Sequence, residues 1–132
     1  MRPIFTRGVL AISGAILSLI GATVMAAPVL FLATSEIIVE HDTSLISEVT
    51  APSGLLIMTG AFLVFGAIKR HLTRPALVLG AIVYCSYGLS RLASAHLHGM
   101  PSQTLITIAY FEMGVAAVLA ALAIGERHSD TA

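Results

Sequence analysis

The sequence predicts an all-α integral membrane protein, a four-helix bundle with both termini in the cytoplasm. Three observations lead to this prediction. The 132 residues are 57% hydrophobic and only 11% charged, whereas soluble domains carry roughly 25% charged residues. Four apolar stretches approach or exceed the roughly 20 residues that a spanning helix needs. Nearly all Lys and Arg residues fall on one side of such a bundle. The alternative, an unusually hydrophobic soluble helical protein, would lack the polar surface that solubility requires.

The first predicted helix covers residues 8–33. Its apolar run follows Arg2 and Arg7 and continues beyond the sequence VMAAP. A signal peptide cleaved after Ala26 is an alternative reading, but a signal core is usually only about 7 to 15 residues long. We therefore expect a retained helix with a kink at Pro28, because proline removes one backbone hydrogen bond.

The other three helices are predicted at residues 51–68, 75–94 and 104–124. Pro52 and Pro75 are expected in the first turns of their helices, where a missing N–H is tolerated. None of the stretches shows the strict alternation of a barrel strand. The whole chain is therefore expected to form a single four-helix transmembrane domain, residues 1–132.

The charged residues of the connections predict the orientation. Basic residues favour cytoplasmic loops. Every Lys and Arg except Arg91 lies in a terminal segment or between the second and third helices. The six residues are Arg2, Arg7, Lys69, Arg70, Arg74 and Arg127. The first connection instead carries acids, at Glu36, Glu40, Asp42 and Glu48. We expect the first and third connections to face outward.

Arg91 and Glu112 are charged residues inside predicted helices. At about 1.5 Å per residue, Arg91 would lie roughly 6 Å and Glu112 roughly 12 Å below the outer edge of the hydrocarbon core. An ionised side chain at the bilayer centre costs about 2.5 to 3.5 kcal/mol or more. We therefore expect Arg91 and Glu112 to form an ion pair, with Glu48 as a second acidic partner nearer the surface.

This pair has three interpretations. It fixes the register of two helices, or Arg91 extends alone to the outer headgroups, or the pair belongs to a polar pocket that opens outward. Intramembrane ionisable residues are usually functional, which favours the pocket. Tyr84, Tyr87 and His98 share the helical face of Arg91. The candidate ligand-binding residues are Arg91, Glu112, Glu48, Tyr87, Tyr84 and His98.

Other patterns are weak. His96, His98 and the His41–Asp42 pair form no strong metal-binding motif, so no metal or other cofactor is expected. No basic tract indicates nucleic-acid binding. Glycines recur along the helices, where small residues let helices approach closely in lipid. They are expected to pack the bundle itself, with a homo-oligomer contact as the alternative.

Three segments carry a family resemblance: ISEVTAPSGLLIMTGAFLVFGAI, YGLSRLASAHLHGMPS and AYFEMGVAAVLAALAI. Over residues 8–124 the chain resembles the domain-of-unknown-function 4345 family, small bacterial membrane proteins with DoxX-like architecture. Glu48, Arg91 and Glu112 match an acid at the start of the second helix, an Arg at the end of the third and an acid in the fourth that the family resemblance implies. Thr50 and Ser53 depart from the family pattern, which often has Arg and an aromatic residue there. If those positions line the family's site, the site here is wider and less charged.

The functional expectation is a small protein of the bacterial inner membrane that is not an enzyme. Its outward pocket would bind a small hydrophobic or amphipathic ligand or a partner membrane protein. The alternatives are an accessory membrane subunit of an oxidoreductase, as the DoxX-like resemblance implies, and a small oligomeric transporter. The lipid bilayer is the expected surrounding, and a larger membrane complex is a possible assembly.

Overall fold

The computed structural model describes residues 2–38 and 42–129, and these residues are entirely helical apart from short connections. The helices are α1 (Arg2–Ala26), α2 (Pro28–Ala33), α3 (Thr43–Ile68), α4 (Arg70–His98) and α5 (Gln103–Ser129). All except the short α2 are long and apolar enough to cross a membrane. The predicted all-α class and the four apolar helices are confirmed.

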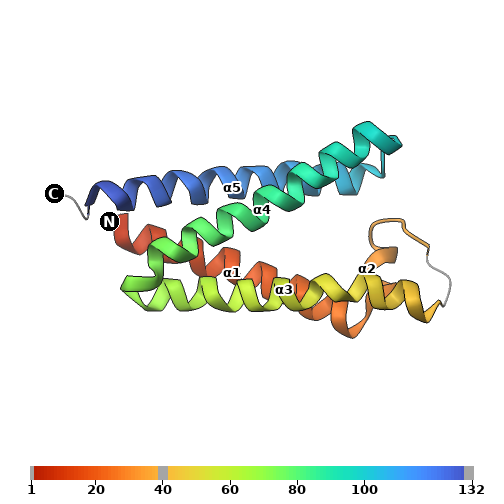
Figure 1. Cartoon of the computed structure of the whole chain (residues 1–132), viewed down its shortest axis with the longest axis horizontal. Coiled ribbons are helices and arrows are strands. Elements are labelled where there is room, and N and C mark those ends of the chain that lie inside the picture. Colours follow the sequence, from red (N-terminus) through yellow and green to blue (C-terminus); the bar gives the residue numbers. More distant parts are fainter. Residues whose placement is uncertain (1, 39–41, 130–132) are drawn as a thin grey trace.

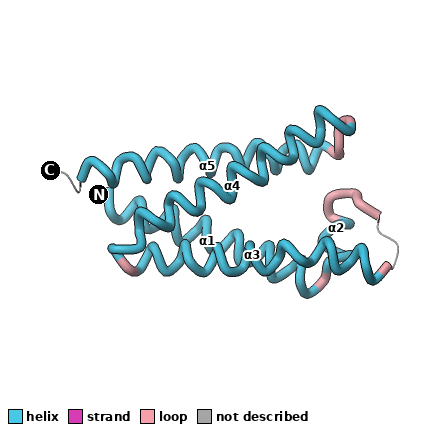
Figure 2. The backbone as a smooth tube through the Cα atoms, viewed as in Figure 1, coloured by secondary structure: helices cyan, strands magenta, loops and turns pink. Residues whose placement is uncertain are grey.

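The long helices are arranged as two pairs (Figure 1). α1 packs along α3, and α4 packs along α5, in the most extensive helix contacts of the structure. The contact between α3 and α4 joins the pairs, whereas α1 touches α4 and α5 only sparingly. The connections are short, and Lys69 is the one residue between α3 and α4 (Figure 2). The fold is therefore two helical hairpins in chain order.

The two ends of the bundle differ in what they carry. The start of α1, the end of α5 and the α3–α4 junction lie at one end, here called the terminal end (Figure 1). The opposite end carries α2 and the α4–α5 connection. Lys69, Arg70 and Arg74 are exposed near the terminal end. The segments that carry most of the basic residues thus lie together, as the sequence pattern predicted.

The first apolar stretch is divided rather than kinked. α1 ends at Ala26, and Ala27 has φ −146° and ψ 65°, outside the helical region. Proline disfavours the helical conformation of the residue before it, so the chain leaves the helix at Ala27 and re-enters it at Pro28. The single helix predicted over residues 8–33 is therefore α1 followed by the separate α2.

The prolines predicted as start signals lie inside helices. α3 begins at Thr43 rather than residue 51, because the Asp42 carboxylate accepts hydrogen bonds from the backbone N–H groups of Ser44 and Leu45 at 2.8 and 3.3 Å. This is the usual arrangement of a helix N-cap. Pro52 lies well inside α3 and Pro75 inside α4. α4 and α5 also extend beyond the predicted limits 75–94 and 104–124.

Glycines bring α1 and α3 together. A Cβ atom added at Gly14 would lie 2.6 Å from the backbone oxygen of Gly60, and one at Gly21 would lie 2.8 Å from that of Ser53. Only residues without a side chain permit such an approach. Gly88 makes a similar close contact with Met113 and so packs α4 on α5. These glycines pack the bundle itself, as expected.

Candidate functional site

Arg91 in α4 and Glu112 in α5 form the predicted ion pair. Nε of Arg91 donates to Oε2 of Glu112 at 3.1 Å. The Arg91 side chain is 33% exposed and that of Glu112 is 13% exposed. Because the pair joins two helices that already pack together, it aligns α4 with α5. Within the described part of the chain, Glu112 is the carboxylate that pairs with Arg91.

The pair lies on the wall of a cavity of about 460 Å³ between the two helix pairs. Every helix contributes to its lining, and the contributions come from the halves of the long helices farther from the terminal end. The lining residues are mostly aliphatic or aromatic, such as Ile20 in α1, Leu56 in α3 and Ile108 in α5. The pocket expected to be polar is thus mainly apolar, with its charged groups gathered on the α4 and α5 side.

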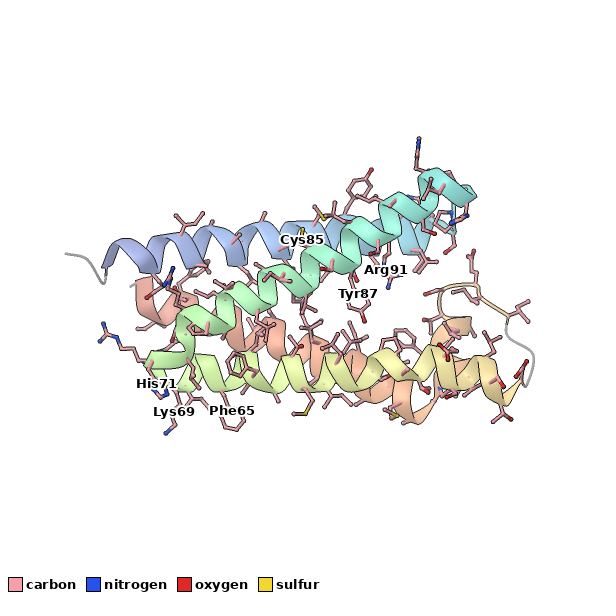
Figure 3. All side chains as sticks on the ribbon, in the orientation of Figure 1. Phe65, Lys69, His71, Cys85, Tyr87 and Arg91 are labelled. Atoms are coloured by element: carbon pink, nitrogen blue, oxygen red, sulfur yellow. The ribbon has the colours of Figure 1, made fainter. Side chains whose placement is uncertain are left out.

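Two tyrosines of α4 also line this cavity. The Tyr84 hydroxyl donates to the backbone oxygen of Ser13 in α1 at 2.8 Å. Tyr87 lies one helical turn closer to Arg91, and both Tyr87 and Arg91 point from α4 toward the α1–α3 pair (Figure 3). Within the described residues, the Tyr87 hydroxyl has no hydrogen-bond partner. Tyr87 and Arg91 therefore present polar groups to the cavity.

The connection after α2 contributes to the lining of the cavity. The backbone N–H of Ile37 donates to the Leu32 oxygen at 3.1 Å, and that of Glu36 to the Ala33 oxygen at 3.1 Å. This is the hydrogen-bond pattern of a Schellman motif, with Glu36 at a positive φ of 64°. The motif folds the chain back, so that both Leu32 and Ile37 line the cavity.

A hydrogen bond fastens this connection to the second hairpin. The Ser102 hydroxyl, just before α5, donates to the backbone oxygen of Ser35 at 3.1 Å. Ser35 is buried and lines the cavity. The connection between α2 and α3 and the connection between α4 and α5 are therefore joined beside the cavity.

The six candidate residues are only partly brought together. Tyr84, Tyr87, Arg91 and Glu112 line one cavity. Glu48 is exposed and borders a separate surface hollow formed by the first turns of α3 alone. His98 is exposed at the end of α4 and does not line the cavity.

The positions where the chain departs from the family pattern also lie outside the cavity lining. The Thr50 hydroxyl donates to the backbone oxygen of Ile46 in its own helix at 2.9 Å. Ser53 is fully buried against α1, and its hydroxyl has no hydrogen-bond partner among the described residues. Thr50 and Ser53 therefore belong to α3 and its packing rather than to the cavity wall.

Several lining residues were not singled out from the sequence. Phe31 in α2, Ser35 after it, and Thr104 and Phe111 in α5 all contact the cavity. Thr104 and Phe111 lie at i−8 and i−1 from Glu112, and helical periodicity places Thr104 and Ile108 on the Glu112 face. No periodic pattern in the sequence indicates that α2 lines the cavity, because its position depends on the break in the helix at Ala27.

The histidines of the connections form no metal centre in the described residues. Within residues 2–38 and 42–129, no group of three or more His, Cys, Asp or Glu side chains is placed to hold a metal ion. His96 and His98 are exposed. Glu40 and His41 lie outside the described residues.

The fold and the site together define a class of protein. It is an all-α protein with four helices of membrane-crossing length and composition, built around an apolar cavity with one ion pair on its wall. The particular family follows from comparison with family models: the model described as Domain of unknown function (DUF4345) matches residues 5–123. The chain belongs to this family. Comparisons with curated proteins and with solved structures gave no match.

Proposed function

We propose that this protein is a small integral membrane protein that binds a small hydrophobic or amphipathic molecule in the cavity beside Arg91 and Glu112. The cavity volume carries the proposal: about 460 Å³ lies within the roughly 300–1,000 Å³ of small-molecule sites. Such sites combine an apolar lining with a few convergent polar groups. The lining described above has this composition.

The proposed setting is the bacterial inner membrane, with both termini in the cytoplasm. Four apolar helices of sufficient length support the membrane. The gathering of Lys69, Arg70 and Arg74 near the terminal end supports a cytoplasmic position for that end, because cytoplasmic loops retain Lys and Arg. The cavity then lies in the outer half of the bundle. A ligand would reach it from the outer leaflet or the outer surface.

Native mass spectrometry tests the proposal. The protein would be released from lipid discs without detergent exchange, and bound small molecules would be weighed. Ile108→Phe adds volume inside the cavity. Ile82→Phe makes the same change on the exposed face of α4, where Ile82 is 58% exposed. We expect a retained small molecule in the wild type and in Ile82→Phe, but not in Ile108→Phe.

Equal occupancy of the two variants would contradict a ligand in this cavity. So would an absence of any bound mass above that of annular lipid in the wild type. The same spectra report assembly. A stoichiometric protein partner would support the accessory-subunit alternative, and a multiple of the chain mass would support an oligomer.

A further inference from the structure

The polar groups of the cavity indicate the chemistry of the ligand's head. We propose that the ligand carries a neutral hydrogen-bond-accepting head, such as a carbonyl group, which receives hydrogen bonds from the Arg91 guanidinium and the Tyr87 hydroxyl. This inference rests on the proposed function, because it assumes that the cavity is a binding site. The head group is the feature by which the cavity would select one lipophilic molecule over another.

Unused donors face the cavity. Arg91 donates through Nε to Glu112, and its two terminal nitrogens have no protein acceptor within the described residues. The guanidinium group carries five N–H donors, so four remain. The Tyr87 hydroxyl is a further donor one turn away. Both side chains point from α4 toward the α1–α3 pair (Figure 3) and line the cavity. Unpaired donors in an apolar site favour a ligand that brings acceptors.

The charges of the lining argue against an anionic head. Among the described residues that line the cavity, Arg91 and Glu112 carry the formal charges, and these two charges cancel. An added carboxylate or phosphate would give the cavity a net negative charge and would lie close to the Glu112 carboxylate. An uncompensated charge in a low-dielectric site is costly. A neutral acceptor uses the same donors without that cost.

The apolar walls suit the rest of such a molecule. From the polar cluster the lining continues along Ile108 and Leu105 in α5, Leu56 in α3 and Ile20 in α1. These side chains offer no hydrogen bonds. The site therefore fits a hydrocarbon or ring system with its acceptor at one end.

Photoaffinity labelling in lipid discs tests the head. Three probes share a ten-carbon chain with a diazirine and end in a methyl group, a methyl ketone or a sulfonate, which stays anionic at all working pH values. The readout is a ratio. Its numerator is the labelling yield in segment 104–112, which contains the cavity-lining residues of α5, and its denominator is the yield at the exposed positions of segment 117–124. This ratio corrects for the different partitioning of the probes into the bilayer.

We expect the methyl ketone to give at least a threefold higher ratio than either other probe. Glu112→Gln removes the negative charge and leaves Arg91 unneutralised, so the sulfonate should gain at least threefold. Glu126→Gln makes the same change in the last turns of α5, outside the cavity lining, and should match the wild type. Tyr87→Phe should lower ketone labelling while sulfonate labelling stays low.

The outcomes separate the two proposals. Equal ratios for all three heads would overturn the head-group inference and leave the apolar binding site standing. Preference for the sulfonate in the wild type would overturn it in favour of an anionic ligand. No cavity labelling by any probe would overturn both. If Glu112→Gln does not fold, the order of the three probe ratios in the wild type and the effect of Tyr87→Phe on ketone labelling still test the head-group inference.

Discussion

The Tyr84 hydroxyl in α4 lies 2.8 Å from the backbone oxygen of Ser13 in α1 and donates a hydrogen bond to it. This bond crosses between the two helical hairpins, at a place where α1 and α4 have few other contacts. Tyr84 is 3% exposed and lines the cavity. The bond therefore fixes the separation of the hairpins at the cavity wall.

Loss of this bond should loosen the junction between the hairpins. Tyr84→Phe keeps the ring and removes the donor, so we expect the free energy of unfolding to fall by about 0.5–1.5 kcal/mol, the usual net value of one hydrogen bond. Thermal unfolding in mild detergent measures the change. Tyr110→Phe is the matched control, because Tyr110 is 65% exposed. Equal effects of the two substitutions would show that the Ser13 contact contributes nothing.

Removal of Arg91 should cost more than removal of Glu112. Arg91→Ala leaves the Glu112 carboxylate, which is 13% exposed, without its partner, and an unsatisfied buried group costs about 1–3 kcal/mol. Arg91 is 33% exposed and has a long side chain, so after Glu112→Ala it can extend toward the outer headgroups. Unfolding of both single variants and the double variant gives the coupling free energy.

Arg74→Ala is the control for this cycle, since Arg74 is exposed on the same helix. We expect the double variant to be more stable than Arg91→Ala, because it removes the unpaired charge as well. Strict additivity of the two single substitutions would mean that the ion pair makes no energetic contribution.

The close approach of α1 and α3 should not tolerate a methyl group. Gly14→Ala places a Cβ 2.6 Å from the backbone oxygen of Gly60, and a backbone atom yields only if the helices separate. We expect a loss of about 1–3 kcal/mol, as for other overpacked cores. Gly114→Ala has nothing within 4 Å of the added Cβ. It should be neutral or stabilising by up to about 1 kcal/mol, and the thermal midpoints of the two variants compare them directly.

Cysteine labelling should reveal the orientation. In a Cys85→Ala background, Ser47→Cys places a thiol in the first turns of α3 and His71→Cys places one beside the α3–α4 junction, both at exposed positions. We expect a membrane-impermeant maleimide to label Ser47→Cys in intact spheroplasts and His71→Cys only after lysis. The positive-inside rule gives the reason. The reverse pattern would show that the bundle is inverted.

The long helices and the Arg91–Glu112 ion pair could be predicted from the sequence because both have strong physical signals. Apolar runs of this length have few alternatives to spanning helices, and two opposite charges at similar depth favour pairing. The predicted helix limits are less accurate, because proline marks a helix start only when it lies in the first turn, and Pro52 and Pro75 lie farther inside their helices. The true start of α3 is set by the Asp42 cap, whereas Pro52 is accommodated within the helix.

The cavity lining depends on features with weaker signals in the sequence. α2 faces the cavity because the chain breaks at Ala27 and turns back through the motif at Glu36. The predicted place of Glu48 beside Arg91 rests on its position along the chain, whereas Glu48 is exposed and borders a separate surface hollow at the start of α3. The position of a residue along its helix could be predicted from residue counts, but the rotation of each helix about its own axis could not.

The pairing of neighbouring helices has a consequence for biogenesis. α1 and α3 can associate while the ribosome is still adding the later half of the chain, because their contact needs nothing downstream of Lys69. The cavity proposed to bind a ligand is different, since its walls come from both hairpins. It is completed only at the last step of synthesis, so nascent chains arrested before α5 should show the first hairpin protected from protease and no ligand retained.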